Sequence, residues 1–224
     1  MTRLEKYARL LIDVGVNVQK GQDLVISAQV ECAPFVRLCA AYAYEKGARE
    51  VVMNWNDDFL TRKKYELAAD DVFDGVPDYM KLFMDGYSEK KAAFLFLSSA
   101  DPENLKGADP QRIKRWMAAN AKAMKLYRTM QSNGELQWCI AAVPSAGWAK
   151  KVFPGKPEGE AVDALWNAIL ATVYVDGQND AKADWSAHTA RTDARAAAMT
   201  AYNFKSLHYR NALGTDLTVE LPAG

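Results

Sequence analysis

The sequence feature that most constrains the fold is a short apolar run near the middle of the chain. Residues Ala92–Leu97 are all apolar and follow the charged residues Glu89, Lys90 and Lys91. Six residues are too few for an ordinary helix, so the run predicts a strand that is buried on both faces. Such a strand needs helices above and below its sheet, and helical patterns occur on either side of it. The run therefore predicts the central strand of an α/β fold.

Further strands are predicted before and after this run. Segments 23–28 and 50–55 are rich in aliphatic residues and are joined by a helical pattern that ends at Gly47. Another strand pattern, 136–143, stops at Pro144, which cannot donate a hydrogen bond to a sheet. Strand, helix and strand with short joints form right-handed parallel units. We therefore expect a doubly wound, mostly parallel four-stranded sheet flanked by helices, with the strand order 2-1-3-4 by analogy with other doubly wound sheets.

The pattern changes toward the end of the chain. An alanine-rich helical pattern over about residues 181–202 is followed by two short strand patterns, 207–210 and 216–221. Gly214 lies between the two strand patterns. A glycine between two such patterns predicts a C-terminal β-hairpin with a longer loop.

The composition excludes several classes of partner. The chain has 28 basic and 28 acidic residues, so its net charge is zero, and it has no arginine-rich or lysine-rich arm. We therefore expect no nucleic-acid partner. No apolar run approaches the length of a membrane span, so we expect no membrane partner either. The three cysteines lack the C-x-x-C spacing and indicate a reducing, cytoplasmic location.

The common catalytic and nucleotide-binding motifs are missing from the sequence. The turn after the first predicted strand, 29–34, has no glycine, although a dinucleotide site needs glycines there for close approach to a pyrophosphate. The two histidines, His188 and His208, lie in separate predicted elements without an H-E-x-x-H motif. We therefore favour a structural role for each histidine and predict no metal-ligating or catalytic residue in this chain.

Polar residues cluster where the predicted strands end. The carboxyl ends of parallel strands share one edge of a sheet, where open α/β folds have their ligand crevice. Side chains at this edge could line a polar site for a substrate amine or contact another domain. For Asp58 and Asp101 we favour a second interpretation, in which each carboxylate caps a helix or turn. The candidate cleft-lining residues are Glu31, Asn54, Asp57, Asp58, Ser98, Asp101, Ser145 and Trp148.

The segment around the fourth predicted strand carries a family resemblance. Residues 138–154 read WCIAAVPSAGWAKKVFP, and further matching segments are 4–8, 18–22, 97–102, 160–166 and 207–222. Together they resemble the N-terminal domain of the metallo-aminopeptidase family that includes aminopeptidase T and the bacterial aminopeptidases S, the thermophilic metalloprotease family. The resemblance covers essentially all of this chain but only the first half of a family member.

The resemblance implies a two-domain parent that removes N-terminal amino acids from peptides. The second domain of the parent would hold two divalent metal ions, zinc, cobalt or similar, and the parent resembles a homodimer with an enclosed chamber. None of the metal-binding motifs of that domain occurs in this sequence. We therefore expect 1–204 to be the N-terminal α/β domain and 205–224 to be a hairpin that starts a truncated C-terminal domain. The chain would wall the cleft and the dimer chamber and would be inactive alone.

Other functions remain open at this point. The alternative to an aminopeptidase half is a stand-alone, non-catalytic module that binds a small molecule or a protein on the same fold. A nucleotide-dependent enzyme fits the predicted fold but not the glycine-free turn 29–34. Saturable nucleotide binding would favour the enzyme, whereas assembly only with a second domain would favour the aminopeptidase.

Overall fold

The structure is a computed structural model that describes residues 1–175 and 180–222. Contacts within the chain divide it into two compact units, Met1–Gln178 and Asn179–Gly224. The helix over about 181–202 therefore belongs by its contacts to the second unit, whereas the sequence analysis placed it in the first domain. The domain boundary after residue 204 stays a prediction.

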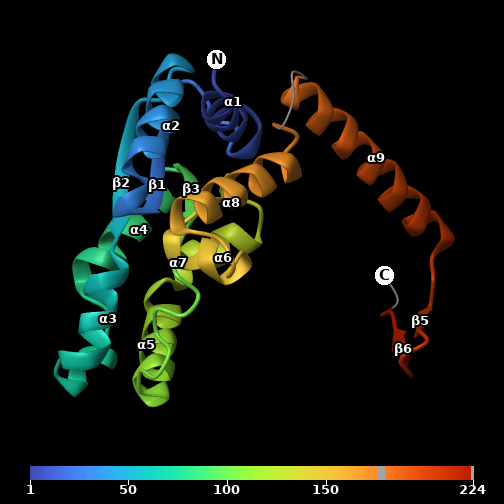
Figure 1. Cartoon of the computed structure of the whole chain (residues 1–224). Coiled ribbons are helices and arrows are strands. Elements are labelled where there is room, and N and C mark those ends of the chain that lie inside the picture. The colour runs from blue at the N-terminus through green and yellow to red at the C-terminus, as the bar shows by residue number, and fades with distance from the viewer. Residues whose placement is uncertain (176–179, 223–224) are drawn as a thin grey trace. The chain divides into compact units, whose positions relative to one another are not determined.

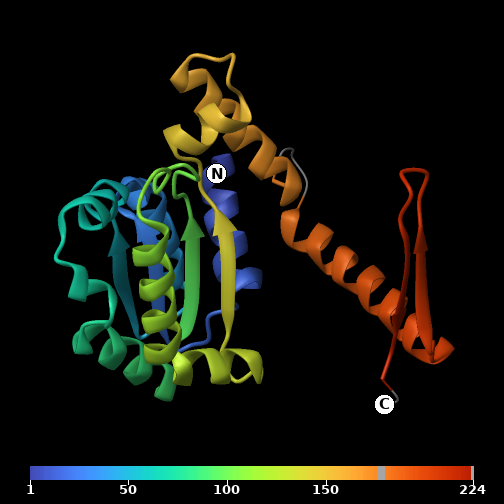
Figure 2. The ribbon, with the colours of Figure 1, turned by 90° about the horizontal axis from the view of Figure 1, so that it is seen from below.

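The first unit is built on a parallel four-stranded sheet with the strand order β2-β1-β3-β4 (Figures 1 and 2). Its strands are β1 (Asp23–Gln29), β2 (Glu50–Asn56), β3 (Ala93–Ser98) and β4 (Trp138–Ala142). In the register, Ile26 of β1 lies opposite Met53 of β2 and Leu95 of β3. The α/β class, the parallel sheet and the predicted strand order are confirmed.

The apolar run that predicted the central strand is deeply buried. Ala92, Ala93, Phe94 and Leu95 are all 0% exposed. Burial of a side chain as large as that of Phe94 stabilises a fold by roughly 1.5–3 kcal/mol. The two strands that flank β3, namely β1 and β4, satisfy its backbone hydrogen bonds on both sides. The sheet is therefore anchored at the point where the sequence pattern was strongest.

Helices cover both faces of this sheet (Figure 2). On one face, the rings of Tyr7, Phe35 and Trp166 pack together, with centroids 5.3 Å apart for Tyr7 and Phe35 and 5.7 Å apart for Phe35 and Trp166. This cluster joins α1 (Arg3–Leu10), α2 (Ala33–Glu45) and α8 (Glu158–Thr172). On the other face, Phe94 packs with Tyr127 and with half-buried residues of α4, with ring centroids 5.0 Å apart for Phe94 and Tyr127.

The remaining helices of the first unit connect these layers. The longer ones are α3 (Asp58–Leu67), α4 (Asp78–Glu89), α5 (Pro110–Ala123), α6 (Lys125–Ser132) and α7 (Ala146–Val152). Shorter helical turns are η1 (Leu11–Gly15), η2 (Val30–Cys32) and η3 (Asp70–Phe73). Cys32, Cys39 and Cys139 are all free thiols. Among residues 1–175 and 180–222, no helix is long and apolar enough to cross a membrane.

The second unit contains one long helix and a hairpin. They are α9 (Ala181–Tyr202), β5 (Ser206–Arg210) and β6 (Asp216–Glu220). The strands pair antiparallel, with Leu207 opposite Val219, so the predicted hairpin is confirmed. The Nε2 atom of His208 lies 2.5 Å from the Asp216 Oδ1 atom across the hairpin, a structural contact of the kind expected for this histidine.

Candidate functional site

The candidate site lies at the carboxyl edge of the sheet. Because the four strands are parallel, their last residues, Gln29, Asn56, Ser98 and Ala142, all lie at this edge. Figure 2 shows the strand arrowheads at this end, next to the loop that follows β3. Open α/β folds bind their ligands at this edge. The loop and α7 therefore occupy the place where the sequence predicted a cleft.

Asp58 connects three segments at this edge. Its Oδ1 atom accepts a hydrogen bond from Gln29 Nε2, and its Oδ2 atom accepts one from the Asp101 backbone N–H, both at 2.8 Å. The Asn104 side chain donates to the Asp58 backbone oxygen at 3.0 Å. Hydrogen bonds to a carboxylate are stronger than those between neutral groups. Asp58 therefore holds the end of β1, the start of α3 and the loop after β3 together.

The interpretation of Asp58 as a helix cap is wrong. Asp57 is the N-cap of α3, and its Oδ1 atom accepts from the Leu60 N–H at 3.0 Å. Asp58 is the first residue inside the helix, so its carboxylate is free to turn toward β1 and the loop. The capping interpretation is confirmed for Asp101, whose Oδ1 atom accepts from the Glu103 N–H at 2.9 Å.

Asp101 also contacts the start of α7. A Cβ atom on Gly147 would overlap the Asp101 carboxyl group, so the close approach requires glycine at this position. Ser145 is the N-cap of α7, and its Oγ atom accepts from the Trp148 N–H at 3.2 Å. The structure therefore gathers Asp58, Asp101, Ser145 and Trp148 in one corner, which we call the carboxyl-edge corner, with Gly147 between them.

The other candidate residues do not join this corner. Glu31 and Ser98 are exposed, and the Ser98 backbone oxygen accepts from the Val143 N–H at 3.0 Å. The Asn54 side chain donates to Ser27 Oγ at 3.2 Å and lines a separate cavity. Asp57 is occupied as a cap. Glu31 lies in η2, Asp57 is the cap of α3, and Asn54 lies two residues before the end of β2, so these positions are not all strand ends.

The sequence analysis missed residues that complete the corner. Gln29, Asn104 and Gly147 each contact Asp58 or Asp101. Gln29 is the last residue of β1, so the strand-end argument that selected Glu31 could have selected Gln29 as well. Asn104 and Gly147 carry no such signal, because their contacts arise between segments that are distant in the sequence.

Further polar contacts fix the loop after β3. The guanidinium of Arg62 in α3 donates to the backbone oxygens of Asn104 at 3.0 Å and Lys106 at 2.7 Å. Lys151 of α7 pairs with Glu103 at 2.8 Å. The hydrogen bond from Lys151 lowers the pKa of Glu103. The loop is therefore attached on both sides and forms a fixed border of the corner.

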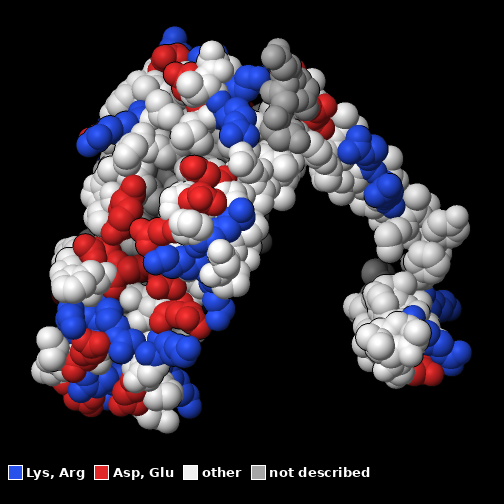
Figure 3. Space-filling model, viewed as in Figure 1, with Lys and Arg blue, Asp and Glu red and all other residues white. Residues whose placement is uncertain are grey.

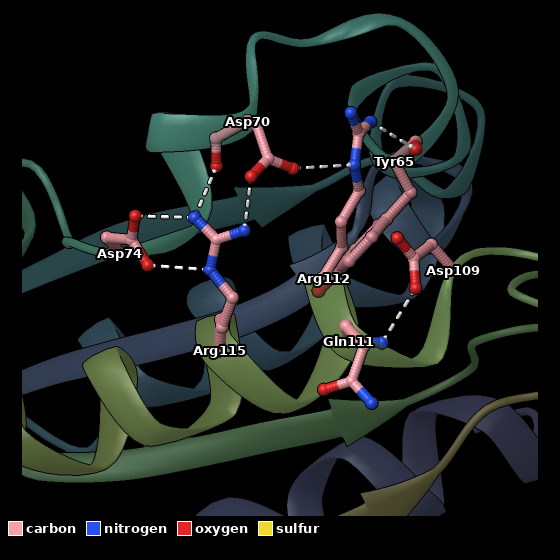
Figure 4. Close-up of polar contacts among 7 residues, drawn as sticks. All are labelled: Tyr65, Asp70, Asp74, Asp109, Gln111, Arg112 and Arg115. Atoms are coloured by element: carbon pink, nitrogen blue, oxygen red, sulfur yellow. Dashed lines mark hydrogen bonds and ion pairs between the residues drawn. The ribbon is translucent and has the colours of Figure 1, made fainter.

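A second polar cluster braces α5 against η3 (Figure 4). Arg115 pairs with both Asp70 and Asp74, and its Nε atom lies 2.6 Å from Asp74 Oδ1. Arg112 pairs with Asp70 at 3.2 Å and donates to the Tyr65 backbone oxygen at 3.1 Å. The hydrogen bonds from Arg115 lower the pKa of Asp70 and of Asp74. These groups neutralise one another at the surface, so the cluster is a brace between helices.

The charge distribution agrees with this interpretation. In Figure 3, acidic and basic side chains are interspersed over the region of α3 and α5. Interspersed charges produce no large field of one sign to attract a charged substrate. The corner itself presents fixed hydrogen-bonding groups.

The described residues do not fit a metal centre. Among residues 1–175 and 180–222, no group of three or more His, Cys, Asp or Glu side chains could hold a metal ion. A catalytic zinc site needs about three such ligands. Asp58 and Asp101 instead accept hydrogen bonds from amide and backbone N–H groups.

Comparison with known proteins gives a consistent set of relatives. The family model described as thermophilic metalloprotease (M29) matches residues 1–224. Aminopeptidase AmpS of Bacillus subtilis (strain 168) is 40% identical over 220 residues, which are 98% of this chain and 53% of that protein. Aminopeptidase T of Thermus thermophilus is 38% identical over 221 residues, which are 99% of this chain and 54% of that protein.

A solved structure gives the same coverage. Wild-type AmpT from Thermus thermophilus matches with a TM-score of 0.89 and 37% sequence identity, over 98% of this chain and 53% of that chain. The chain therefore spans about half the length of the relatives that it matches.

Proposed function

Since the chain belongs to the thermophilic metalloprotease (M29) family, we propose that it is the N-terminal half of a metal-dependent aminopeptidase that removes N-terminal amino acids from peptides. One observation carries the proposal: relatives named aminopeptidase match nearly all of this chain but only about half of their own length. The other half of the parent would then bind the peptide substrate together with this one.

In this proposal the chain contributes shape and no catalytic residue. The part of the chain that the structure describes contains no group of residues that could hold a metal ion. The two divalent metal ions, zinc, cobalt or similar, would therefore be bound by the C-terminal domain of the parent. The chain alone would be inactive.

The carboxyl-edge corner suits the role of a cleft wall. Its carboxylates accept hydrogen bonds from Gln29 and from backbone N–H groups, so the corner is ordered before any substrate arrives. Preorganised walls lower the entropic cost of binding. In the parent, this wall would face the C-terminal domain and the chamber of a homodimer. We also propose a cytoplasmic location, which the three free cysteines support because a reducing compartment keeps thiols reduced.

A chimera tests this proposal. Residues 1–224 are joined to the part of Bacillus subtilis AmpS that this chain does not match, and hydrolysis of leucine p-nitroanilide is measured with added Zn²⁺ or Co²⁺. We expect activity from the chimera that EDTA removes, and none from the chain alone. Intact AmpS is the matched control for the assay.

Two outcomes would contradict the proposal. One is hydrolysis by the chain alone at a rate similar to that of the chimera. The other is a chimera that elutes as a folded protein and takes up metal but cleaves no peptide, while intact AmpS is active.

A further inference from the structure

A cavity of about 630 Å³ lies within the first unit, and none of the residues of the carboxyl-edge corner lines it. Its walls come from β2, β3, α4 and the adjoining ends of α5 and α6. The volume falls within the usual range of small-molecule sites, about 300–1,000 Å³. Asn54, one of the predicted cleft residues, lines this cavity.

One wall of the cavity is apolar. Met80, Phe83 and Met84 of α4 and Phe96 of β3 line it, and each of them is only half-buried. Apolar surface therefore remains uncovered inside a concavity, where a ligand could bury it. Methionine side chains adapt to the shape of a bound group, and aromatic rings stack on another ring. This wall favours a flat, apolar group such as an aromatic ring.

The charge of the cavity lining is positive. Arg128 lines it together with asparagine side chains, and no acidic residue is among the lining residues. Arg128 is an exposed residue, and its side chain has no ion pair or hydrogen bond with any residue that the structure describes. An unpaired guanidinium among neutral amides favours a carboxylate, which it binds through two parallel hydrogen bonds.

We propose that this cavity binds a small aromatic carboxylate, with its ring between α4 and Phe96 and its carboxylate at Arg128. The absence of lining carboxylates selects against a ligand with an ammonium group, because that cation would find no counter-charge. The proposal rests on the cavity alone and does not depend on aminopeptidase activity.

Isothermal titration calorimetry on the 224-residue chain tests the proposal with three probes. 3-Phenylpropionate carries the ring and the carboxylate, 3-phenylpropionamide lacks the charge, and L-phenylalanine adds an ammonium group. We expect saturable binding of 3-phenylpropionate and affinities about tenfold lower for the other two, as the loss of a charge-assisted hydrogen bond predicts.

One variant and a matched control locate the site. Arg128→Gln should weaken the binding of 3-phenylpropionate about tenfold and make acid and amide bind alike. Arg37→Gln is the matched control, since Arg37 is an exposed arginine of α2 outside the cavity.

The proposal is overturned if 3-phenylpropionate shows no saturable binding up to about 10 mM, a limit well above the dissociation constant expected for a specific site. It is equally overturned if acid and amide bind the unmodified chain with equal affinity, or if Arg128→Gln and Arg37→Gln change the affinity to the same extent. None of these results would affect the chimera test, which measures peptide hydrolysis.

Discussion

The two units of this chain reach regular structure by different means. In the first unit, β3 is paired on both sides, and Ala93, Phe94 and Leu95 are 0% exposed. In the second unit, every residue of β6 is exposed, and Ala181 is the one buried residue among 180–222. The first unit is held by tertiary packing, whereas the second depends on local signals.

Those local signals are clear in α9. Asp180 accepts hydrogen bonds from the N–H groups of Lys182 and Ala183 at the start of the helix, and Asn203 ends it in the left-handed conformation. Alanine has the highest intrinsic helix propensity, and α9 is rich in it. The comparison teaches that helix and hairpin patterns suffice for secondary structure, whereas stability requires a buried face.

The largest expected effect tests this difference directly. Phe94→Ala in β3 should lower the free energy of unfolding by about 3–5 kcal/mol, because it leaves a cavity in a fully buried cluster. Leu217→Ala in β6 is the matched control, since Leu217 is 52% exposed. It should cost less than about 1 kcal/mol. Urea denaturation measures both values, and equal losses would refute the contrast between the units.

A smaller effect is expected within the carboxyl-edge corner. Asp58→Asn should cost about 1–2 kcal/mol, because an NH2 group replaces one of the two oxygens that accept from Gln29 and from the Asp101 N–H. Asp57→Asn is the control at the neighbouring position. It should be nearly neutral, since asparagine caps helices as well as aspartate does.

Thermal unfolding at neutral pH compares these two variants. A larger loss for Asp57→Asn than for Asp58→Asn would show that the carboxylate of Asp58 does not connect the strand ends. That result would mean that the polar contacts of the corner contribute as little to stability as an exposed contact such as His208–Asp216 in the hairpin.

The smallest effect concerns the surface brace of the first unit. Arg115 lowers the pKa of Asp70 and Asp74 below the unfolded value, which is about 3.9 for aspartate. Their contribution to stability is therefore present above about pH 4 and is lost as the pH falls through the lowered pKa values of the folded state. Arg115→Gln should reduce stability slightly at pH 7, and the difference from the unmodified chain should vanish as the pH falls below 4.

Urea midpoints measured from pH 7 to about pH 2.5 test this expectation. Added salt should shrink the difference at pH 7, because these ion pairs are exposed. A difference that does not change with pH would mean that Arg115 acts through packing alone.

Much of the architecture could be predicted from local patterns. The apolar run at β3, the strand order and the hairpin around Gly214 are confirmed, because strand and turn signals lie within a few consecutive residues. The capping of Asp58 was wrong, since the same pattern of two consecutive aspartates allows either residue to cap α3. A shift of one position at the start of α3 decides which of the two carboxylates caps the helix and which one contacts β1 and the loop after β3.

The sequence by itself determined the α/β class, the order of the elements and the resemblance to a metallopeptidase family. The tertiary structure decided which side chains meet. Asp58 contacts Asp101 across 43 positions of sequence, and the cavity at Tyr127 is formed by two strands and three helices. Periodicity and turn residues act over short distances along the chain, so they fix the elements. Contacts between distant segments depend on how those elements pack, and no local pattern encodes that packing.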